Sequence, residues 1–182
     1  MFPHLIQTAR LRLRRPRAED AGGIYIRYAG DPEVTRYLSW PTHRSVDDTR
    51  AFLEYAEAGW EDGSSLAYLV ERLSDGVLLG STGLVIESPS CFSTGYVFAR
   101  DSWGNGYASE SLAAMLELAF VQPSVARVYA LCDAEHRASA RVMEKCGMRP
   151  EGLRRAHTIL PNLSPHPRDM LCYAKLRTPG RD

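Results

Sequence analysis

The stretch DSWGNGYASESLAAMLELAF, residues 101–120, places a turn with two glycines directly before an amphipathic helix. Gly104 and Gly106 lack a Cβ, so the amides of residues 105–109 can converge on one anion. The helix behind the turn adds the positive end of its dipole and its unpaired first-turn N–H groups. The stretch therefore predicts a phosphate-binding cradle, although many such turns only connect a strand to a helix.

The composition predicts one globular domain over residues 1–182, because 45% of the residues are hydrophobic and the chain is too short for two comfortable cores. Lys+Arg and Asp+Glu both number 22, so no net field attracts nucleic acid or an anionic membrane. We therefore expect a small-molecule partner. The arginine-rich residues 10–17 are the local exception, and a solvated strand face is favoured there over a basic docking patch.

Other features of the chain favour a reduced, cytoplasmic location. No apolar run approaches the length of a membrane helix, and the N-terminus lacks the pattern of a secretory signal. The four cysteines are far apart and form no C-x-x-C pair: Cys91, Cys132, Cys146 and Cys172. This spacing predicts free thiols, and neither a disulfide framework nor a metal site.

Hydrophobic periodicity and turn signals predict an α+β fold with a mixed sheet. The expected elements are about seven strands and about four helices. The strands are expected near residues 11–13, 66–71, 77–86, 94–98, 127–132, 155–160 and 170–175, and the helices near residues 18–29, 45–60, 107–120 and 136–146. The strands between residues 66 and 98 form an antiparallel meander in this scheme, and a proline-rich loop, residues 161–167, separates the last two strands.

Four segments together resemble the GCN5-related N-acetyltransferase (GNAT) family, particularly its RimJ/RimL-type branch, which acetylates the N-termini of ribosomal proteins. The segments are TARLRLRRPRAEDA (8–21), GYVFARDSWGNGYASESL (95–112), AEHRASARVMEKCGMRPEG (134–152) and RDMLCYAKL (168–176). The resemblance implies the GNAT fold, a mostly antiparallel mixed sheet flanked by helices. It also implies acetyl transfer from acetyl-CoA to a primary amine within a ternary complex. A protein N-terminus, an amino acid, a polyamine or an aminoglycoside would each suit such a site.

The resemblance also assigns residues to coenzyme A by position. The backbone of residues 96–98 would pair with the pantetheine arm, and the amides of residues 104–109 would hold the pyrophosphate. The cofactor-binding set it implies is Tyr96, Val97, Phe98, Trp103, Gly104, Asn105, Gly106, Tyr107, Ala108, Ser109 and His136. Two of these depart from the family pattern: Trp103 replaces a Gln or Arg of the general form, and His136 replaces an Asn that contacts pantetheine.

Ser139 is the predicted general acid. Many family members carry a tyrosine that protonates the departing thiolate where this chain has Met143, which has no proton to donate. Ser139 lies on the inward stripe of its predicted helix, and in the ribosomal-protein branch a serine at the matching position is the proposed acid. The alternative is that its hydroxyl bonds to a carbonyl one turn earlier. A strand amide near Val97 or Phe98 is the expected oxyanion donor.

The general base is the least defined role. His157 and Asp169 are the candidates, and either residue is more often structural than catalytic. About one α-amine in ten is neutral at pH 7, against about one lysine in two thousand. A chain without an evident base therefore suits an α-amine acceptor. None of the cysteines has an activating pattern, so we expect no covalent acyl-enzyme.

Two other classes of function compete with this interpretation. A nicotinamide-dependent oxidoreductase would use the glycine turn for a dinucleotide, but Ser109 occupies the third glycine position and no β-α-β unit begins there. A non-catalytic module that binds acetyl-CoA would explain Met143 and His136. The oligomeric state stays open, with a homodimer as one option.

Overall fold

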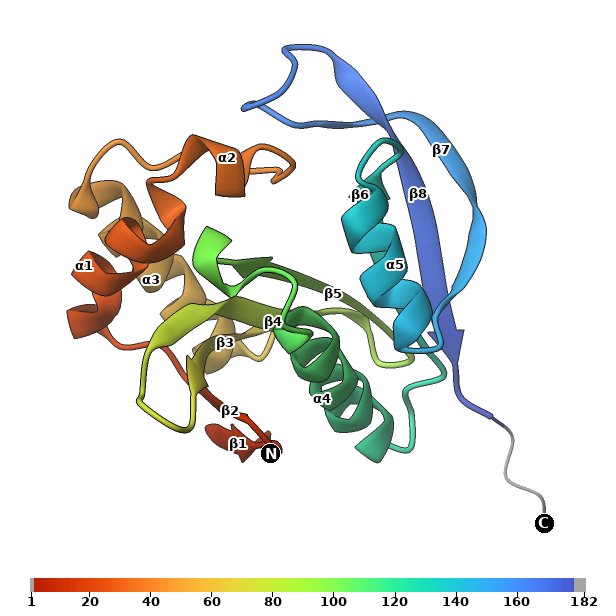
Figure 1. Ribbon diagram of the computed structural model, residues 1–182. Coiled ribbons are helices and arrows are strands. Elements are labelled where there is room, and N and C mark those ends of the chain that lie inside the picture. Colours follow the sequence, from red (N-terminus) through yellow and green to blue (C-terminus); the bar gives the residue numbers. More distant parts are fainter. Residues whose placement is uncertain (1, 179–182) are drawn as a thin grey trace.

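The computed structural model describes residues 2–178 (Figure 1). Its strands form one eight-stranded sheet in the order β1-β2-β3-β4-β5-β6-β8-β7. Their bounds are β1 Leu5–Gln7, β2 Leu11–Arg14, β3 Ser65–Arg72, β4 Leu78–Ser88, β5 Cys91–Phe98, β6 Arg127–Asp133, β7 Arg149–Ile159 and β8 Pro167–Leu176. Neighbouring strands are antiparallel except for β5 and β6, which are parallel.

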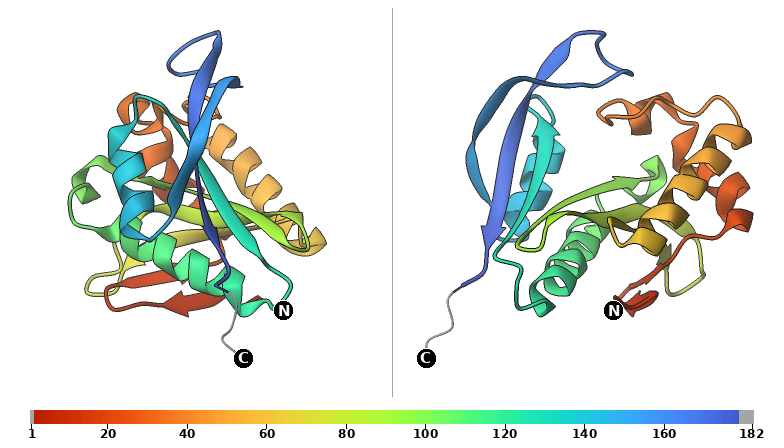
Figure 2. Two further views of the ribbon diagram at one scale, coloured as in Figure 1. Left: turned by 90° about the vertical axis from the view of Figure 1, so that its right-hand side faces the viewer. Right: turned by 180° about the vertical axis from the view of Figure 1, so that it is seen from behind.

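Helices cover both faces of the sheet (Figure 2). The α-helices are α1 Ala21–Ile24, α2 Pro32–Thr35, α3 Val46–Asp62, α4 Tyr107–Val121 and α5 Arg137–Lys145. Side chains point to alternate faces along a strand, so each strand contributes residues to the hydrophobic cores on both faces of the sheet. Phe98 packs in the core beneath α4 and α5, whereas Val97 and Ala99 pack in the core beneath α1 and α3. Within residues 2–178, no helix has the length and apolar character needed to cross a membrane.

The predicted α+β fold with a mixed, mostly antiparallel sheet is confirmed, and the structure adds one strand, β1, and one short helix, α2. Two local predictions also hold. Ser45 and Asp48 form the capping box that begins α3. Gly147 adopts φ of 75° directly after α5, as expected of a helix stop.

The predicted helix over residues 18–29 is wrong in detail. The segment consists of a 3₁₀ turn (Ala18–Asp20), α1 and a π-turn (Tyr25–Ala29). The π-turn is closed by the N–H of Gly30, which donates to the carbonyl of Tyr25 at 3.0 Å. Pro32 follows and occupies the first turn of α2, where the ring does not disturb a helix, so it begins a helix as well as ending one.

The predicted strand near residues 155–160 begins six residues earlier, at Arg149. It is the edge strand β7, and most of its side chains are exposed, so it lacks an alternating apolar pattern. Its register shifts twice against β8, and Ala156 at one shift has a positive φ of 45°. Bulges of this kind interrupt the alternation of side chains, so a strand that contains them is not detected from a two-residue hydrophobic period. The proline-rich loop covers residues 160–166, one position earlier than expected, because β7 ends at Ile159 and Pro167 opens β8.

Candidate functional site

The candidate site lies where β5 and β6 separate. These parallel strands pair only through Cys91, Phe92 and Ser93 of β5 with Arg127, Val128 and Tyr129 of β6. Beyond these residues the strands diverge (Figure 1), and residues 94–98 pair only with β4 while residues 130–133 pair only with β8. We call the opening between these two segments the wedge. Its β5 edge offers unpaired backbone groups, as the edge of a sheet does.

Backbone geometry shows which residues face the wedge. Ala99 donates its N–H to β4 at 2.7 Å. Backbone groups of successive strand residues point to alternate edges, so those of Tyr96 and Phe98 point into the wedge and those of Val97 point to β4. The Phe98 carbonyl already accepts the indole Nε1–H of Trp103 at 2.7 Å. Of the two amides expected as oxyanion donors, that of Phe98 is therefore the one directed at the wedge.

The glycine turn has the geometry of an anion cradle. Gly104 and Gly106 have φ of 77° and 80°, in the left-handed region that glycine tolerates best. Within the described residues, none of the six amides of residues 104–109 donates to a protein acceptor, and the first bonded amide is that of Glu110, to Gly106 O at 3.1 Å. Six N–H groups at the start of α4 are therefore available to a bound anion.

The cradle is anchored from the turn between β1 and β2 by contacts that the sequence did not predict. Glu110 accepts hydrogen bonds from the Thr8 hydroxyl at 2.5 Å and from Arg10 N and Nε at 2.8 and 2.7 Å. Arg10 Nη1 also donates to Asn105 O at 3.0 Å. Burial opposes the ionisation of Glu110, but these donors outweigh it and lower the pKa of its carboxyl. Arg10, paired with Glu110, thus ties the turn at Asn105 to the start of α4.

Ser139 lies across the wedge from β5 and contacts Tyr96. The Tyr96 hydroxyl lies 2.8 Å from Ser139 Oγ and donates to the Ser139 carbonyl oxygen at 3.1 Å. Since a carbonyl only accepts, the single Tyr96 proton serves that bond, and the Ser139 hydroxyl then donates to Tyr96. The bond to a carbonyl one turn earlier is not formed within residues 2–178. Burial raises the pKa of Tyr96, so the phenol stays protonated.

Two neighbours of Ser139 complete this part of the wedge. Cys132 on β6 is buried, and burial raises the pKa of its thiol to about 11, so it is a poor nucleophile at neutral pH. Met143, one turn along α5, is 1% exposed and packs in the core. The replacement of a tyrosine by methionine therefore makes this position structural.

His136 ends the loop before α5 and stacks on Tyr37, with ring centroids 4.3 Å apart and 19° between the planes. Burial lowers the pKa of His136, against the weaker opposing effect of Asp133. It is therefore predominantly neutral at pH 7. Sequence reasoning missed Tyr37, because it lies 99 positions earlier in the chain.

The two predicted base candidates lie on the β7–β8 hairpin and are exposed. Asp169 accepts the N–H of Ala156 at 2.8 Å, which holds the bulge in β7. His157 contacts Thr158 at 2.9 Å and Arg154 at 3.3 Å. Within the described part of the chain, no hydrogen bond joins either residue to Ser139 or Tyr96.

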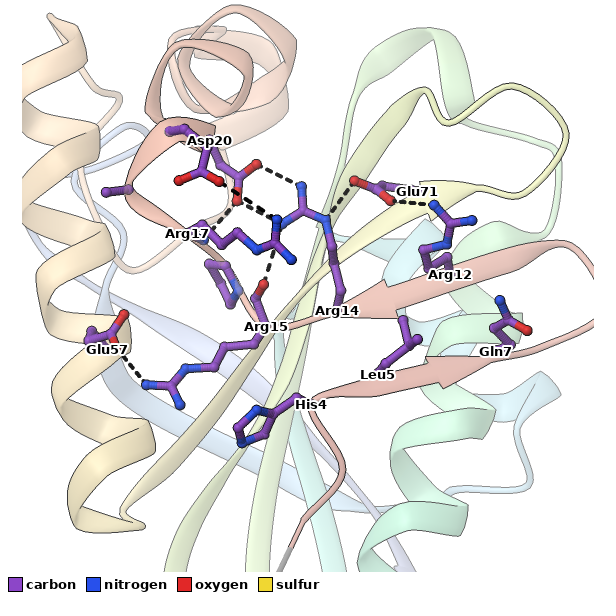
Figure 3. Close-up of a pocket in the computed structure, with 13 residues that line it drawn as sticks. His4, Leu5, Gln7, Arg12, Arg14, Arg15, Arg17, Asp20, Glu57 and Glu71 are labelled. Carbon is purple, nitrogen blue, oxygen red and sulfur yellow. Dashed lines mark hydrogen bonds and ion pairs between the residues drawn. The ribbon is translucent and has the colours of Figure 1, made fainter.

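A separate hollow of about 930 Å³ lies beside β1 and β2, away from the wedge (Figure 3). Its arginines are paired with acids: Arg14 with Asp20 at 2.6 Å and with Glu71 at 2.7 Å, and Arg15 with Glu57 at 2.6 Å. Each cation is offset by a carboxylate, so the hollow has little net attraction for an anion. The arginine-rich segment is thus an ion-paired strand face, as the sequence favoured.

Comparison with known proteins identifies the family of the chain. The family model described as an acetyltransferase (GNAT) domain matches residues 10–149. The uncharacterised N-acetyltransferase YoaA of Bacillus subtilis is 26% identical over 97% of this chain and 99% of its own. A GNAT-family acetyltransferase structure from Bacillus anthracis shares 27% identity, covers 94% of this chain and 98% of its own, and has a TM-score of 0.82.

A third relative shares the fold at lower identity. RimL, a ribosomal L7/L12 α-N-protein acetyltransferase solved in complex with coenzyme A, is 19% identical, covers 94% of this chain and 97% of its own, and has a TM-score of 0.83. The family match spans well over half of the chain, including the wedge-lining part of β5, the cradle and α5. The chain therefore belongs to the GNAT acetyltransferase family.

Proposed function

We propose that this single-domain N-acetyltransferase acetylates the α-amine of a peptide N-terminus, by direct transfer from acetyl-CoA bound in the wedge. The observation that carries the proposal is the combination of six free amides at residues 104–109 with a free β5 edge. A pyrophosphate supplies the acceptors that these amides lack. A pantetheine arm, which contains amide groups, suits an unpaired strand edge in the manner of an added strand.

The residues present suit coenzyme A along its length. Arg10 and Glu110 hold the cradle in place from the turn before β2, and the backbone of Tyr96 and Phe98 points into the wedge. RimL, which shares the fold, binds coenzyme A. His136 stands at the start of α5, where its ring can contact pantetheine in place of the usual asparagine.

The chemistry assigned to the chain needs two donors. The neutral amine attacks the thioester carbon, a C–N bond forms, and the N–H of Phe98 stabilises the negative charge on the former carbonyl oxygen. The C–S bond then breaks, and the thiolate takes the proton of the Ser139 hydroxyl. Tyr96 lies 2.8 Å from that hydroxyl and holds it in place by a hydrogen bond, and water then returns a proton to the serine oxygen. The proton lost by the amine passes to water.

The preference for an α-amine rests on the groups that surround the wedge. Burial raises the pKa values of Tyr96 and Cys132 and lowers that of His136, so none of them is a strong base near pH 7. About one α-amine in ten is already neutral at that pH, whereas lysine is almost entirely charged. An enzyme without a strong base is therefore expected to prefer an α-amine, because a larger share of it is already deprotonated.

Two matched peptides test the proposal. One pentapeptide carries a free serine N-terminus and an Nε-acetylated lysine, and its partner carries an acetylated N-terminus and a free lysine. Thiol release from acetyl-CoA is measured with each, together with alaninamide and spermidine. We expect turnover with the free α-amine and kcat/KM lower by about 100-fold with the free lysine. Preference for lysine or spermidine would overturn the proposed acceptor, and binding without any turnover would indicate a non-catalytic module.

A further inference from the structure

Residues 31–42, from the start of α2 to the loop after it, cross the mouth of the wedge (Figure 1). We call this segment the strap. At one end, Asp31 and Glu33 pair with Arg100, which lies just beyond the end of β5. In its middle, Tyr37 stacks on His136 at the start of α5. The strap therefore spans the two strand ends that the wedge separates.

A single side chain from the β7–β8 loop fastens the strap. Asn162 Nδ2 donates to the carbonyls of Thr35 at 2.8 Å and Trp40 at 2.9 Å. Its Oδ1 accepts from Thr42 N at 2.8 Å and from Thr42 Oγ1 at 3.1 Å. All four contacts are partly buried, and they span 120 to 127 positions in the chain.

The partners of Asn162 determine the orientation of its amide. Two carbonyl oxygens require the NH₂ group on one side, and the Thr42 N–H requires an oxygen on the other. A flipped amide would oppose oxygen to oxygen and donor to donor. Neither a carboxylate nor an aliphatic side chain can therefore replace Asn162 without loss of contacts.

The Asn162 contacts are separate from the cofactor side of the wedge. Asn162 bonds only to strap residues within the described chain, whereas the cradle is anchored by Arg10 and Glu110. Strap and cradle thus have different supports. We therefore expect a change at Asn162 to loosen residues 35–42 of the strap, while Arg10 and Glu110 still hold the amides of residues 104–109.

We propose that Asn162 is a positioning residue for the acceptor: it holds the strap as a wall for the part of the acceptor that lies beyond the amine. The inference rests on the proposed function and narrows its substrate class to acceptors with a chain long enough to reach the strap. A displaced wall loosens the pose of such an acceptor, and misplacement of about 1 Å can reduce rates by about 100-fold. The rate with a small amine that does not reach the strap should stay unchanged.

The test compares Asn162→Asp and Asn162→Ala with Ser164→Ala as the matched control. Ser164 lies in the same loop, and among the described residues its Oγ accepts only from His166 N, with no bond to the strap. The probes are the free-N-terminus pentapeptide, alaninamide and acetyl-CoA. Circular dichroism and hydrogen exchange of residues 35–42 show whether each variant folds and whether the strap opens.

For both Asn162 variants we expect the KM of the pentapeptide to rise by about 10-fold, with the Kd of acetyl-CoA changed by less than about twofold. The ratio of kcat/KM for the pentapeptide to that for alaninamide should fall by a similar factor, and Ser164→Ala should change neither. A uniform loss with both acceptors would indicate a structural role and overturn the inference. An unchanged pentapeptide KM would do the same, whereas a wild type inactive with both acceptors would overturn the proposed function as well.

Discussion

The cradle and the strap border the same wedge but satisfy their polar groups in opposite ways. Within residues 2–178, the cradle leaves six consecutive amides without protein acceptors. In the strap, Thr35, Trp40 and Thr42 all bond to one asparagine. Main-chain N–H groups without protein acceptors can bind a ligand, whereas a hydrogen-bond network with all its partners present fixes the shape of a surface. Under the proposed function, the backbone recognises the cofactor, and loops joined across the fold recognise the acceptor.

The largest expected effect comes from a variant that leaves both regions intact. Ser139→Ala removes the hydroxyl that lies between them, and kcat should fall by about 100-fold or more because the thiolate loses its proton donor. Acetyl-CoA affinity, measured by calorimetry, should stay constant. Tyr96→Phe keeps the ring and should cost about 10-fold. Undiminished kcat in Ser139→Ala would show that water or another group protonates the thiolate.

The next effect would break the cradle alone. Gly104→Asp puts a carboxylate among the free amides, where a Cβ meets no atom within 4 Å. Repulsion of the pyrophosphate should raise the Kd of acetyl-CoA by about 100-fold, equal to about 2.7 kcal/mol. Gly104→Asn has the same shape and tolerates the same positive φ without the charge, so it is the matched control. Equal losses in both variants would assign the effect to backbone strain instead.

A smaller effect should follow from weakening the support of the cradle. Glu110→Gln removes the charge that accepts from Thr8 and Arg10, at a cost of about 1 kcal/mol in unfolding free energy. The Kd of acetyl-CoA should rise by about fivefold, with no change in the pentapeptide KM. Glu117→Gln, an exposed position on the same helix, is the control. A shift in the pentapeptide KM would show that cradle and strap are coupled.

The smallest expected effect distinguishes the two regions by pH. Burial lowers the pKa values of His43 and His136, which lie in or against the strap region, below the ordinary histidine value. The folded state then binds fewer protons than the unfolded state, so unfolding free energy should fall as pH drops from 7 to about 5.5. Asp48 and Asp133 oppose this trend only weakly.

Urea unfolding at the two pH values measures the slope, and His136→Asn should flatten it. Hydrogen exchange should show the strap opening at the lower pH while α4 stays protected. An equal slope in wild type and His136→Asn would exclude His136 as its source.

Much of the fold could be predicted because the relevant signals are local. Gly104 and Gly106 predict a turn with positive φ, and the spacing of apolar residues after them predicts α4. The edge strand β7 could not be bounded, because its side chains are mostly exposed and its bulges interrupt alternation. β1 was not predicted, because it has only three residues, two of them with exposed side chains, and so shows no alternation of apolar and polar residues.

The site divides in the same way. The inward position of Ser139 follows from helical spacing, but its partner Tyr96 lies on another element 43 positions away. The anchoring role of Arg10 was hidden inside an arginine-rich segment whose other members form ion pairs on a strand face. Side chains of one type can have different roles, and only their neighbours distinguish them.

The sequence by itself determined most of the elements, the glycine turn before α4 and the family resemblance, because these depend on the conformational preferences of neighbouring residues. Tertiary structure alone decided the divergence of β5 and β6, the Tyr96–Ser139 contact and the Asn162 fastening of the strap. These features join segments that are 30 to 130 positions apart, and no local pattern records which side chains meet when a sheet closes. The position of Ser139 could therefore be predicted from residue spacing, whereas the strap contacts proposed to bound the acceptor could be seen only in the tertiary structure.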